Sequence, residues 1–330
     1  MTTKFASLSG LAIAAATLAL VTGHDARAQG MTKLDVLVFS PPSLSAFLPP
    51  IIKAQKFDQA NGLDLSFPER TPDAYTTQFN SGEFQVGGAG TLQTVAIADT
   101  RGVKVRYLFN LFDYWGAVVT SRDSVKTLKD LEGKEIAAAR STTNYKMFEF
   151  FAKRQGVDVT KFKVVNTAPP GLVSYAIADR ADAIQIWEPA YTLLMAKKPG
   201  IRTLDLGIAK VWKDFAAASP RIPYLGVAAH AEWADQHPDL VKKLYAAYKA
   251  AAQWVEQHPD EAAPLMFPKS PPADQKDIAS LIRAKDRLGL SLAGATEIRK
   301  EIEAVYKAGI DVGYFDKMPS AQSIYDKPVQ

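Results

Sequence analysis

The sequence predicts an α/β fold, because short apolar runs alternate with amphipathic helical segments from residue 34 onward. Two segments in the middle of the chain, 128–144 and 182–191, each read as a buried strand, a polar loop and a helix start. The length of 330 residues is sufficient for two lobes of ordinary domain size. In open α/β sheets, ligands bind at the carboxyl ends of the strands, so the two polar loops are candidates for a ligand site.

The N-terminus has the pattern of a secretory signal peptide. Lys4 supplies a positive start, an apolar run covers 11–21, and Ala26-Arg27-Ala28 forms a small-x-small cleavage site. A bilayer span needs about 20 apolar residues, so this run is too short for a membrane anchor. We therefore expect a signal peptide over 1–28, cleavage between Ala28 and Gln29, and a soluble exported protein.

Composition limits the chemistry that the chain can perform. It contains no cysteine, which excludes disulfides, thiolate metal sites, cysteine nucleophiles and a lipid anchor on cysteine. Loss of Lys4, Asp25 and Arg27 with the signal peptide lowers the net charge from +4 to +3, and the scattered basic residues do not resemble a nucleic-acid-binding patch. No Ser-His-Asp set and no histidine pair at ligand spacing is visible, so we expect no catalytic residue, metal or cofactor.

Strands are expected where short apolar runs are bounded by turn residues. In chain order they cover 34–39, 63–67, 84–88, 103–109, 116–120, 135–139, 162–165 and 183–187. Residues 89–91 are expected to form a tight loop after the third of these strands. Alternation with helices favours parallel or mixed sheets that have helices on both faces.

Helices are expected where apolar residues recur at a spacing of three and four. They cover 49–56, 92–99, 144–155, 238–255, 273–288 and 295–309, and another begins at 258. Pro49 and Pro50 suit a first helical turn. Thr143 or Asn144 is expected to cap the helix that ends before Gly156.

The first candidate ligand contacts are Ser141, Thr142, Thr143 and Asn144. They lie between a strand and a helix, where free N–H groups and hydroxyls can bind an anion. The same residue types are also ordinary helix caps, and both interpretations remain open. Arg140 and Arg221 are possible counter-charges for an anion, although most arginines are simply solvated.

Two further loops raise the same question. Gly90 and Thr91 either let the backbone approach a ligand closely or form a plain strand-to-helix turn. The loop that contains Ser40, Ser43 and Leu44 is longer than its connection needs, which favours a functional role.

Two pairs of residues next to strand ends are candidates for lining a pocket. Tyr114 and Trp115 could stack on the apolar part of a ligand. Trp187 and Glu188 follow a buried strand, and pocket lining is expected for them as well. The alternatives are a core aromatic for Trp187 and a helix cap ahead of Pro189 for Glu188.

Five segments in consecutive order resemble a known family: 54–63, 80–87, Asp130 to Ile136, Asp182 to Pro189, and 237–262. The chain resembles, over nearly all of its mature length, the periplasmic binding proteins for sulfonates, taurine and nitrate that feed ABC importers. The resemblance implies a type II fold of two α/β lobes, with two hinge crossovers near 118–121 and 224–228. Lobe 1 would comprise 29–121 and 224–330, lobe 2 would comprise 122–223, and the ligand would be held between them.

The resemblance implies a monomeric periplasmic receptor that performs no chemistry. It would capture a small organic anion, such as a sulfonate or a taurine-like or nitrate-like oxyanion, and deliver it to an ABC permease. The alternatives are a same-fold receptor for a pyrimidine or amine, a sensor that docks on a membrane signalling protein, and a same-fold enzyme. Enzymes of the desulfinase type use a cysteine, which this chain lacks. Glu188 either faces the amine of a zwitterionic ligand or caps its own helix.

Overall fold

The computed structural model describes residues 30–216 and 219–330. The expected signal peptide over 1–28, and the cleavage site before Gln29, lie outside the described residues. None of the described helices combines the length and the apolar character needed to cross a membrane.

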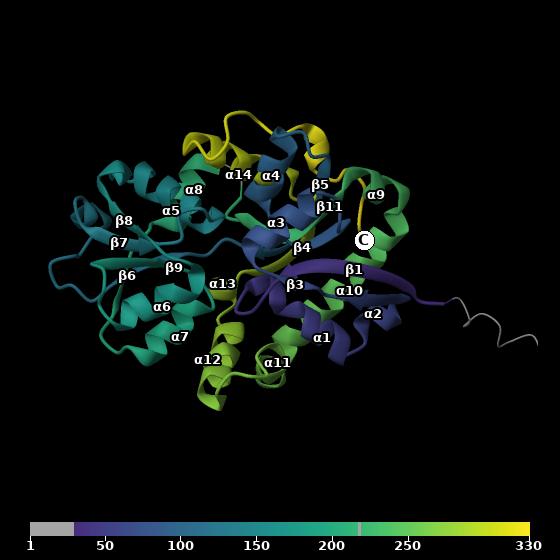
Figure 1. Ribbon diagram of the computed structural model, residues 1–330, viewed down its shortest axis with the longest axis horizontal. Coiled ribbons are helices and arrows are strands. Elements are labelled where there is room, and N and C mark those ends of the chain that lie inside the picture. The colour runs from purple at the N-terminus through teal and green to yellow at the C-terminus, as the bar shows by residue number, and fades with distance from the viewer. Residues whose placement is uncertain (1–29, 217–218) are drawn as a thin grey trace, which may run out of the picture.

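The described elements form two α/β bodies, each built on its own mixed sheet (Figure 1). The larger sheet has the order β12-β5-β11-β4-β1-β2, with β3 paired to β1, and the smaller has the order β10-β6-β9-β7-β8. The strands of the larger sheet are β1 (Thr32–Phe39), β2 (Leu63–Ser66), β3 (Glu69–Arg70), β4 (Val86–Thr91), β5 (Val105–Asp113), β11 (Pro223–His230) and β12 (Leu290–Gly294). Those of the smaller sheet are β6 (Ala117–Thr120), β7 (Glu135–Ala138), β8 (Lys163–Asn166), β9 (Ala183–Ile186) and β10 (Arg202–Leu204).

Helices surround both sheets. The larger body carries α1 (Leu48–Ala54), α2 (Phe57–Ala60), α3 (Pro72–Asn80), α4 (Leu92–Thr100), α9 (Ala231–Gln236), α10 (Pro238–Gln257), α11 (Pro259–Met266), α12 (Pro272–Arg283), α13 (Lys285–Leu288) and α14 (Arg299–Asp311). The smaller body carries α5 (Thr143–Arg154), α6 (Pro169–Ile177) and α7 (Ala190–Lys197), and α8 (Ile208–Ala216) follows its last strand. The predicted α/β class with mixed sheets is confirmed.

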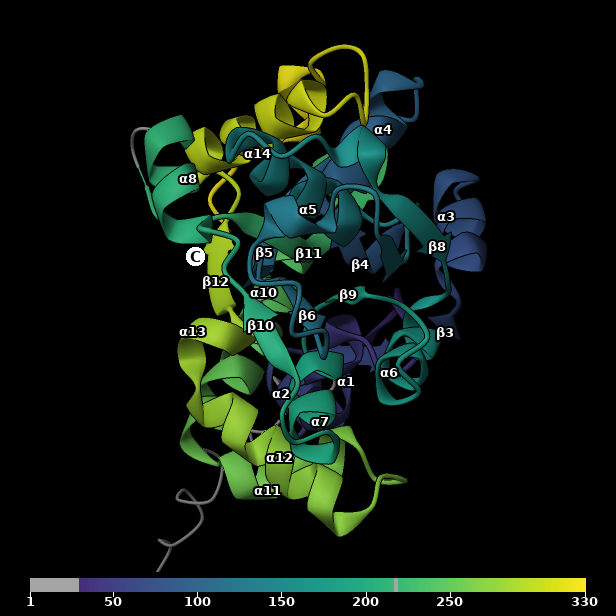
Figure 2. The same ribbon diagram turned by 90° about the vertical axis from the view of Figure 1, so that its left-hand side faces the viewer.

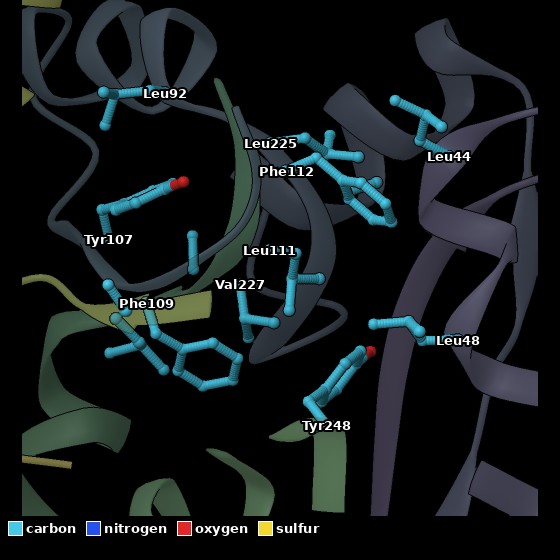
Figure 3. Packing of buried hydrophobic residues seen from close by; sticks show 14 of the residues in the cluster. Leu44, Leu48, Leu92, Tyr107, Phe109, Leu111, Phe112, Leu225, Val227 and Tyr248 are labelled. Carbon is cyan, nitrogen blue, oxygen red and sulfur yellow. The ribbon is translucent and has the colours of Figure 1, made fainter. Parts of the chain in front are cut away.

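The core of the larger body is formed by central strands and the helices packed against them (Figure 3). Phe109 and Val227 lie on adjacent strands, and Tyr248 approaches them from α10 with its ring centroid 5.8 Å from that of Phe109. A fully buried side chain of this size contributes ~1.5–3 kcal/mol, so this cluster is a main source of stability. Phe151 of α5 and Trp212 of α8 join the same core, which ties the two bodies together on one side.

Within its described part, the chain passes between the two sheets at two places. The first passage is residues 114–116, between β5 and β6, and the second is residues 205–222, which include α8. The expected hinges at 118–121 and 224–228 lie beside these passages: 118–120 are paired within the smaller sheet and 225–228 within the larger. The sequence identified these strands but could not show which sheet each one joins. The division into two lobes that move remains a prediction.

Several other elements differ from expectation. Residues 89–91 continue β4 rather than forming a loop, because β11 pairs with them as far as Thr91. The cap of α5 is Thr142, whose hydroxyl accepts from the Tyr145 N–H at 3.2 Å, and not Thr143 or Asn144. The expected helix over 273–288 is interrupted at Ala284, and Leu290–Gly294 forms an edge strand ahead of α14.

Candidate functional site

The carboxyl ends of several strands meet between the two bodies. In the larger sheet β1, β4 and β5 run in the same direction and end at Phe39, Thr91 and Asp113. In the smaller sheet β7 and β9 are parallel, and the start of β6 pairs with the end of β9 at Ile186. Both passages between the sheets, and most of the candidate residues, therefore lie along these two edges.

A direct contact joins the two edges. The hydroxyl of Thr91, at the start of α4, lies 2.9 Å from the hydroxyl of Thr143, at the start of α5, and both side chains are buried. Thr91 also caps α4 by accepting from the Thr94 N–H at 3.4 Å. The starts of two helices, one from each body, are thus brought together. The N–H groups of a first helical turn have no intrahelical acceptor, so this is a place of positive potential.

Buried amides lie next to this contact. Gln185, in the middle of β9, donates to the Asn144 side-chain oxygen at 2.7 Å, and the Asn144 amide donates to the Trp115 carbonyl at 3.4 Å. The Gln185 oxygen and the Tyr114 hydroxyl are buried without a hydrogen-bond partner among the described residues. Burying such groups without a hydrogen-bond partner is costly, so both atoms are candidates for ligand contact. Burial raises the pKa of Tyr114, which keeps its hydroxyl neutral and able to donate.

An aromatic pair, Trp115 and Tyr191, flanks the amides and is called the aromatic wall below. The two rings meet edge to face with their centroids 4.8 Å apart. The Tyr191 hydroxyl is held by Thr203 of β10 at 2.8 Å. Trp187 packs on the same core cluster of the smaller body as the wall, and all three side chains are partly exposed.

Glu188 is not free to contact a ligand in this arrangement. Its carboxylate accepts from the Thr192 N–H at 3.0 Å and the Thr192 hydroxyl at 2.9 Å, which fixes the first turn of α7. Arg287 of α13 lies 3.7 Å from the same carboxylate, and Glu188 is only 1% exposed. Burial raises the pKa of Glu188, although the Thr192 hydrogen bonds and the charge of Arg287 oppose that shift. Of the two roles expected for Glu188, the geometry matches the helix cap.

Arg221 is engaged within the larger body. It donates to Asp113 at 3.2 Å and to the Ser291 hydroxyl at 2.6 Å. The pair fastens the end of the second passage to the start of the first and to β12. A ligand would have to compete with Asp113 for this guanidinium, which makes Arg221 a poor counter-charge for an anion.

The remaining candidates include both exposed and buried residues. Ser43 caps the short turn Leu44–Ala46, and Leu44 is buried in the larger core, while the side chain of Ser40 is exposed. Ser141 is exposed, and its carbonyl accepts from the Tyr314 hydroxyl at 3.2 Å. Gly90 is buried in β4, opposite Gly226 of β11.

The sequence did not single out Gln185, Tyr191, Tyr224 or Arg287. Gln185 could have been found, because it is the one polar side chain in the apolar run Ala183–Ile186. Tyr224 packs edge to face against Tyr114 at 5.8 Å, which depends on the pairing of distant strands. Arg287 comes from the other end of the chain and carries no local signal.

A surface cavity of about 620 Å³ lies elsewhere, at the opposite end of β5. Two of its charged groups are engaged within the protein: Arg106 pairs with Asp235 at 2.7 Å, and Asp99 accepts from the Ser320 hydroxyl at 2.8 Å. Among the residues that the structure describes, no group of three or more His, Cys, Asp or Glu side chains is arranged to hold a metal ion.

Solved structures with the same architecture are periplasmic binding proteins. The Escherichia coli aliphatic sulphonate-binding protein SsuA matches with a TM-score of 0.69 and 15% identity, covering 86% of this chain and 92% of SsuA. The alkanesulfonate-binding SsuA of Xanthomonas axonopodis pv. citri, bound to MOPS, gives 0.68 and 16%, covering 89% and 98%. The nitrate-binding protein NrtA of Synechocystis PCC 6803 gives 0.65 and 14%, covering 87% and 83%.

These structural matches establish the fold, and their low sequence identity leaves the ligand open. Among curated protein sequences, none matches the chain. The family model described as NMT1/THI5 like matches residues 52–262, which is more than half of the sequence. That span includes the ends of β4, β5, β7 and β9 at the facing edges, and both residues of the contact between Thr91 and Thr143. The chain has the periplasmic binding protein fold and belongs to the NMT1/THI5-like family.

Proposed function

We propose that the protein is a periplasmic receptor of an ABC importer, which holds a small organic anion between its two bodies and delivers it to a permease. The observation that supports this proposal is the arrangement of residues between the two sheets. Two helix starts meet at the hydroxyls of Thr91 and Thr143, beside an unpaired Tyr114 hydroxyl and an aromatic wall. N–H groups and hydroxyls suit the oxygens of a sulfonate or related oxyanion, and the wall suits an attached apolar group.

The similar proteins support the same class of ligand. Two of them are described as binding sulfonates and a third as binding nitrate. Sulfonates and nitrate are both oxyanions. In this proposal the protein binds without performing chemistry. The mature form would begin at Gln29 and act as a soluble monomer in the periplasm, and intact-mass analysis of exported protein would test the cleavage site.

A neutral planar ligand, such as a pyrimidine, is the second candidate. It is favoured by the amides of Gln185 and Asn144 and by the pairing of both nearby arginines, Arg221 with Asp113 and Arg287 with Glu188. An unpaired amide oxygen accepts hydrogen bonds but cannot donate to an anion. A ligand that places an N–H group at Gln185 would satisfy that oxygen directly.

A thermal-shift screen separates these candidates, because a ligand that binds only the native state raises the melting temperature. The panel contains alkanesulfonates, taurine, nitrate, simple carboxylates, amines and pyrimidines. A rise with sulfonates alone would support the anion, and a rise with pyrimidines alone would support the neutral ligand. If no member of the panel raises the melting temperature, neither proposal holds for these ligand classes.

The variant Tyr114→Phe tests the site with the ligand that the screen identifies. It removes a buried hydroxyl that has no hydrogen-bond partner in the described part of the chain, so the ligand-free protein should keep its stability. Affinity should fall by about tenfold if that hydroxyl donates to an anionic ligand, as expected for one charge-assisted hydrogen bond.

Tyr248→Phe is the matched control for this experiment. Tyr248 also has a buried hydroxyl for which the described residues offer no hydrogen-bond partner, but it lies in the core of the larger body on α10. Calorimetric titration should show unchanged affinity for this variant. Equal affinities for the wild type, Tyr114→Phe and Tyr248→Phe would remove Tyr114 from the site.

A further inference from the structure

We propose that Arg287 is a positioning residue that joins the two bodies and sets where the aromatic wall stands. It belongs to the larger body, whereas its contacts, Glu188 and Tyr191, belong to the smaller one. The inference rests on the proposed function only in taking the wall to be a surface that contacts ligand. The link between the bodies can be measured without any ligand.

Two contacts of Arg287 act together. Its Nη1 lies 3.7 Å from the Glu188 Oε1, and its guanidinium carbon lies 5.8 Å from the centroid of the Tyr191 ring. Tyr191 in turn packs against Trp115 at 4.8 Å. A displacement of Arg287 is therefore transmitted to both rings of the wall, because Tyr191 stands between Arg287 and Trp115.

Arg287 is itself held firmly at the first passage between the sheets. Gly289 ends α13 with a positive φ of 66°, and its carbonyl accepts from the Asp113 N–H at 2.7 Å. Leu290 then pairs with Phe112 at the end of β5. Trp115 leaves the same strand end two residues after Asp113. Arg287 and Trp115, which both contact Tyr191, are therefore each attached to the end of β5.

The charge of Glu188 makes this contact different from the other ion pairs between the bodies. Glu188 is almost fully buried, and a buried carboxylate that loses its counter-charge is strongly unfavourable. Lys197 also reaches across, to Asp274 at 2.8 Å, but its side chain is 43% exposed. Exposed pairs of that kind contribute little, and Lys197 does not touch the wall. Of these two ion pairs between the bodies, the one at Arg287 therefore opposes their relative movement more strongly.

The absence of cysteine allows a ligand-free measurement on the full mature protein. Cysteines introduced at the exposed positions Asp123 and Lys242, one on each body, carry spin labels for distance measurement by electron paramagnetic resonance. The variants are Arg287→Met, which removes the charge and the planar group, and Arg287→Lys, which removes only the planar group. The control is Lys285→Met on the same helix, because Lys285 pairs with Glu256 of its own body.

The distance distribution should broaden and shift to longer values in Arg287→Met, change less in Arg287→Lys, and stay unchanged in Lys285→Met. The fluorescence contribution of Trp115, obtained by subtracting matched proteins that carry Trp115→Phe, should shift in both Arg287 variants and not in the control. A residue with a merely structural role would lower the melting temperature without moving either signal.

The outcome that overturns the proposal is a cooperatively folded Arg287→Met protein with the distances and the Trp115 emission of the wild type. If Arg287→Met alone does not fold, the double variant Glu188→Gln/Arg287→Met removes the stranded charge and is measured in its place, with the same expectation. These measurements use no ligand, so a negative ligand screen would not change their outcome. Equally, unchanged distances and Trp115 emission would not change the result of the ligand screen.

Discussion

At the scale of single residues, hydrogen-bond partners decide between roles that the sequence leaves open. Glu188 is the clearest case, since a carboxylate beside a candidate site could receive an amine or cap a helix. Its two oxygens are occupied by Thr192 four residues later and approached by Arg287. A zwitterionic ligand would have to displace these contacts from a side chain that is 1% exposed. The amine-binding role is therefore the weaker of the two.

Glu188 should leave a signature in the pH dependence of stability. Burial raises its folded-state pKa above the ordinary value of 4.5, so the native protein holds this proton more tightly than the unfolded chain. The contribution of the group to stability is then most favourable below pH 4.5 and declines as the pH rises through the folded pKa. Urea unfolding should show that the free energy of unfolding of the wild type falls relative to that of Glu188→Gln between about pH 4 and pH 7.

Glu256→Gln provides the comparison, because Glu256 is exposed and its ion pair with Lys285 is loose at 3.6 Å. Replacing this exposed and loosely paired side chain should change the free energy of unfolding only slightly. A pH-independent difference for Glu188→Gln would mean that the carboxyl titrates alike in the folded and unfolded protein.

The candidate residues show why the site was only partly predictable from sequence. The strand-to-helix transitions at Thr91 and Thr143 were identified because such transitions carry a local signal. Their mutual contact, and the approach of Arg287, depend on segments far apart in the chain. A local pattern can place a side chain at the end of a strand, but it cannot identify the distant residue that this side chain will contact.

At the scale of elements, the central strand β11 is the most constrained. It pairs antiparallel with β4 on one side and β5 on the other. A Cβ at Gly226 would collide with the Phe109 carbonyl oxygen and the Tyr107 ring of the neighbouring strand. The backbones can approach as they do only because this position carries no side chain.

Gly226→Ala should therefore destabilise the fold by about 1–3 kcal/mol or more, as overpacking against a rigid backbone does. Chemical denaturation would report it as a lower midpoint. Gly30→Ala is the control, since nothing lies within 4 Å of a Cβ at that position. Similar midpoints for the two variants would show that β11 can shift to accept a methyl group.

Most strands and long helices were predicted close to their observed positions, because periodicity and caps are local. The antiparallel pairing of β11, the continuation of β4 to Thr91 and the edge strand β12 were not predicted. In each case the missing information is a partner strand from a remote part of the chain. Gly90 illustrates this, since a glycine before a helix suggests a turn until β11 is placed opposite it.

At the scale of the whole molecule, the site exists only because two sheets present the same kind of edge to each other. Figure 2 views the molecule from the smaller body, with α7 near α12 at the bottom and α5 near α14 at the top. On the α7 side Lys197 reaches Asp274, and on the α5 side Lys153 donates to the Asp311 carbonyl at 2.6 Å. Among the residues that the structure describes, those that pass between the sheets are 114–116, 205–216 and 219–222.

Ligand binding should shift the protein toward its compact form. A ligand held between the bodies gains contacts from both only when they are closed, so it favours the closed population in proportion to its differential affinity. Small-angle scattering should show a smaller radius of gyration at saturation with the ligand found in the thermal screen. Tyr114→Phe at the same ligand concentration should give an intermediate value, because fewer molecules are occupied.

An unchanged radius of gyration, with binding independently confirmed by the melting temperature, would contradict closure as the mechanism. In that case the contacts between Thr91 and Thr143 and between Arg287 and Glu188 would already hold the ligand-free protein closed. Arg287→Met separates the two explanations. If the radius of gyration depends on ligand in Arg287→Met but not in the wild type, the wild type is closed before binding, and Arg287 holds it closed. If ligand leaves the radius unchanged in that variant as well, the site fills without relative movement of the two bodies.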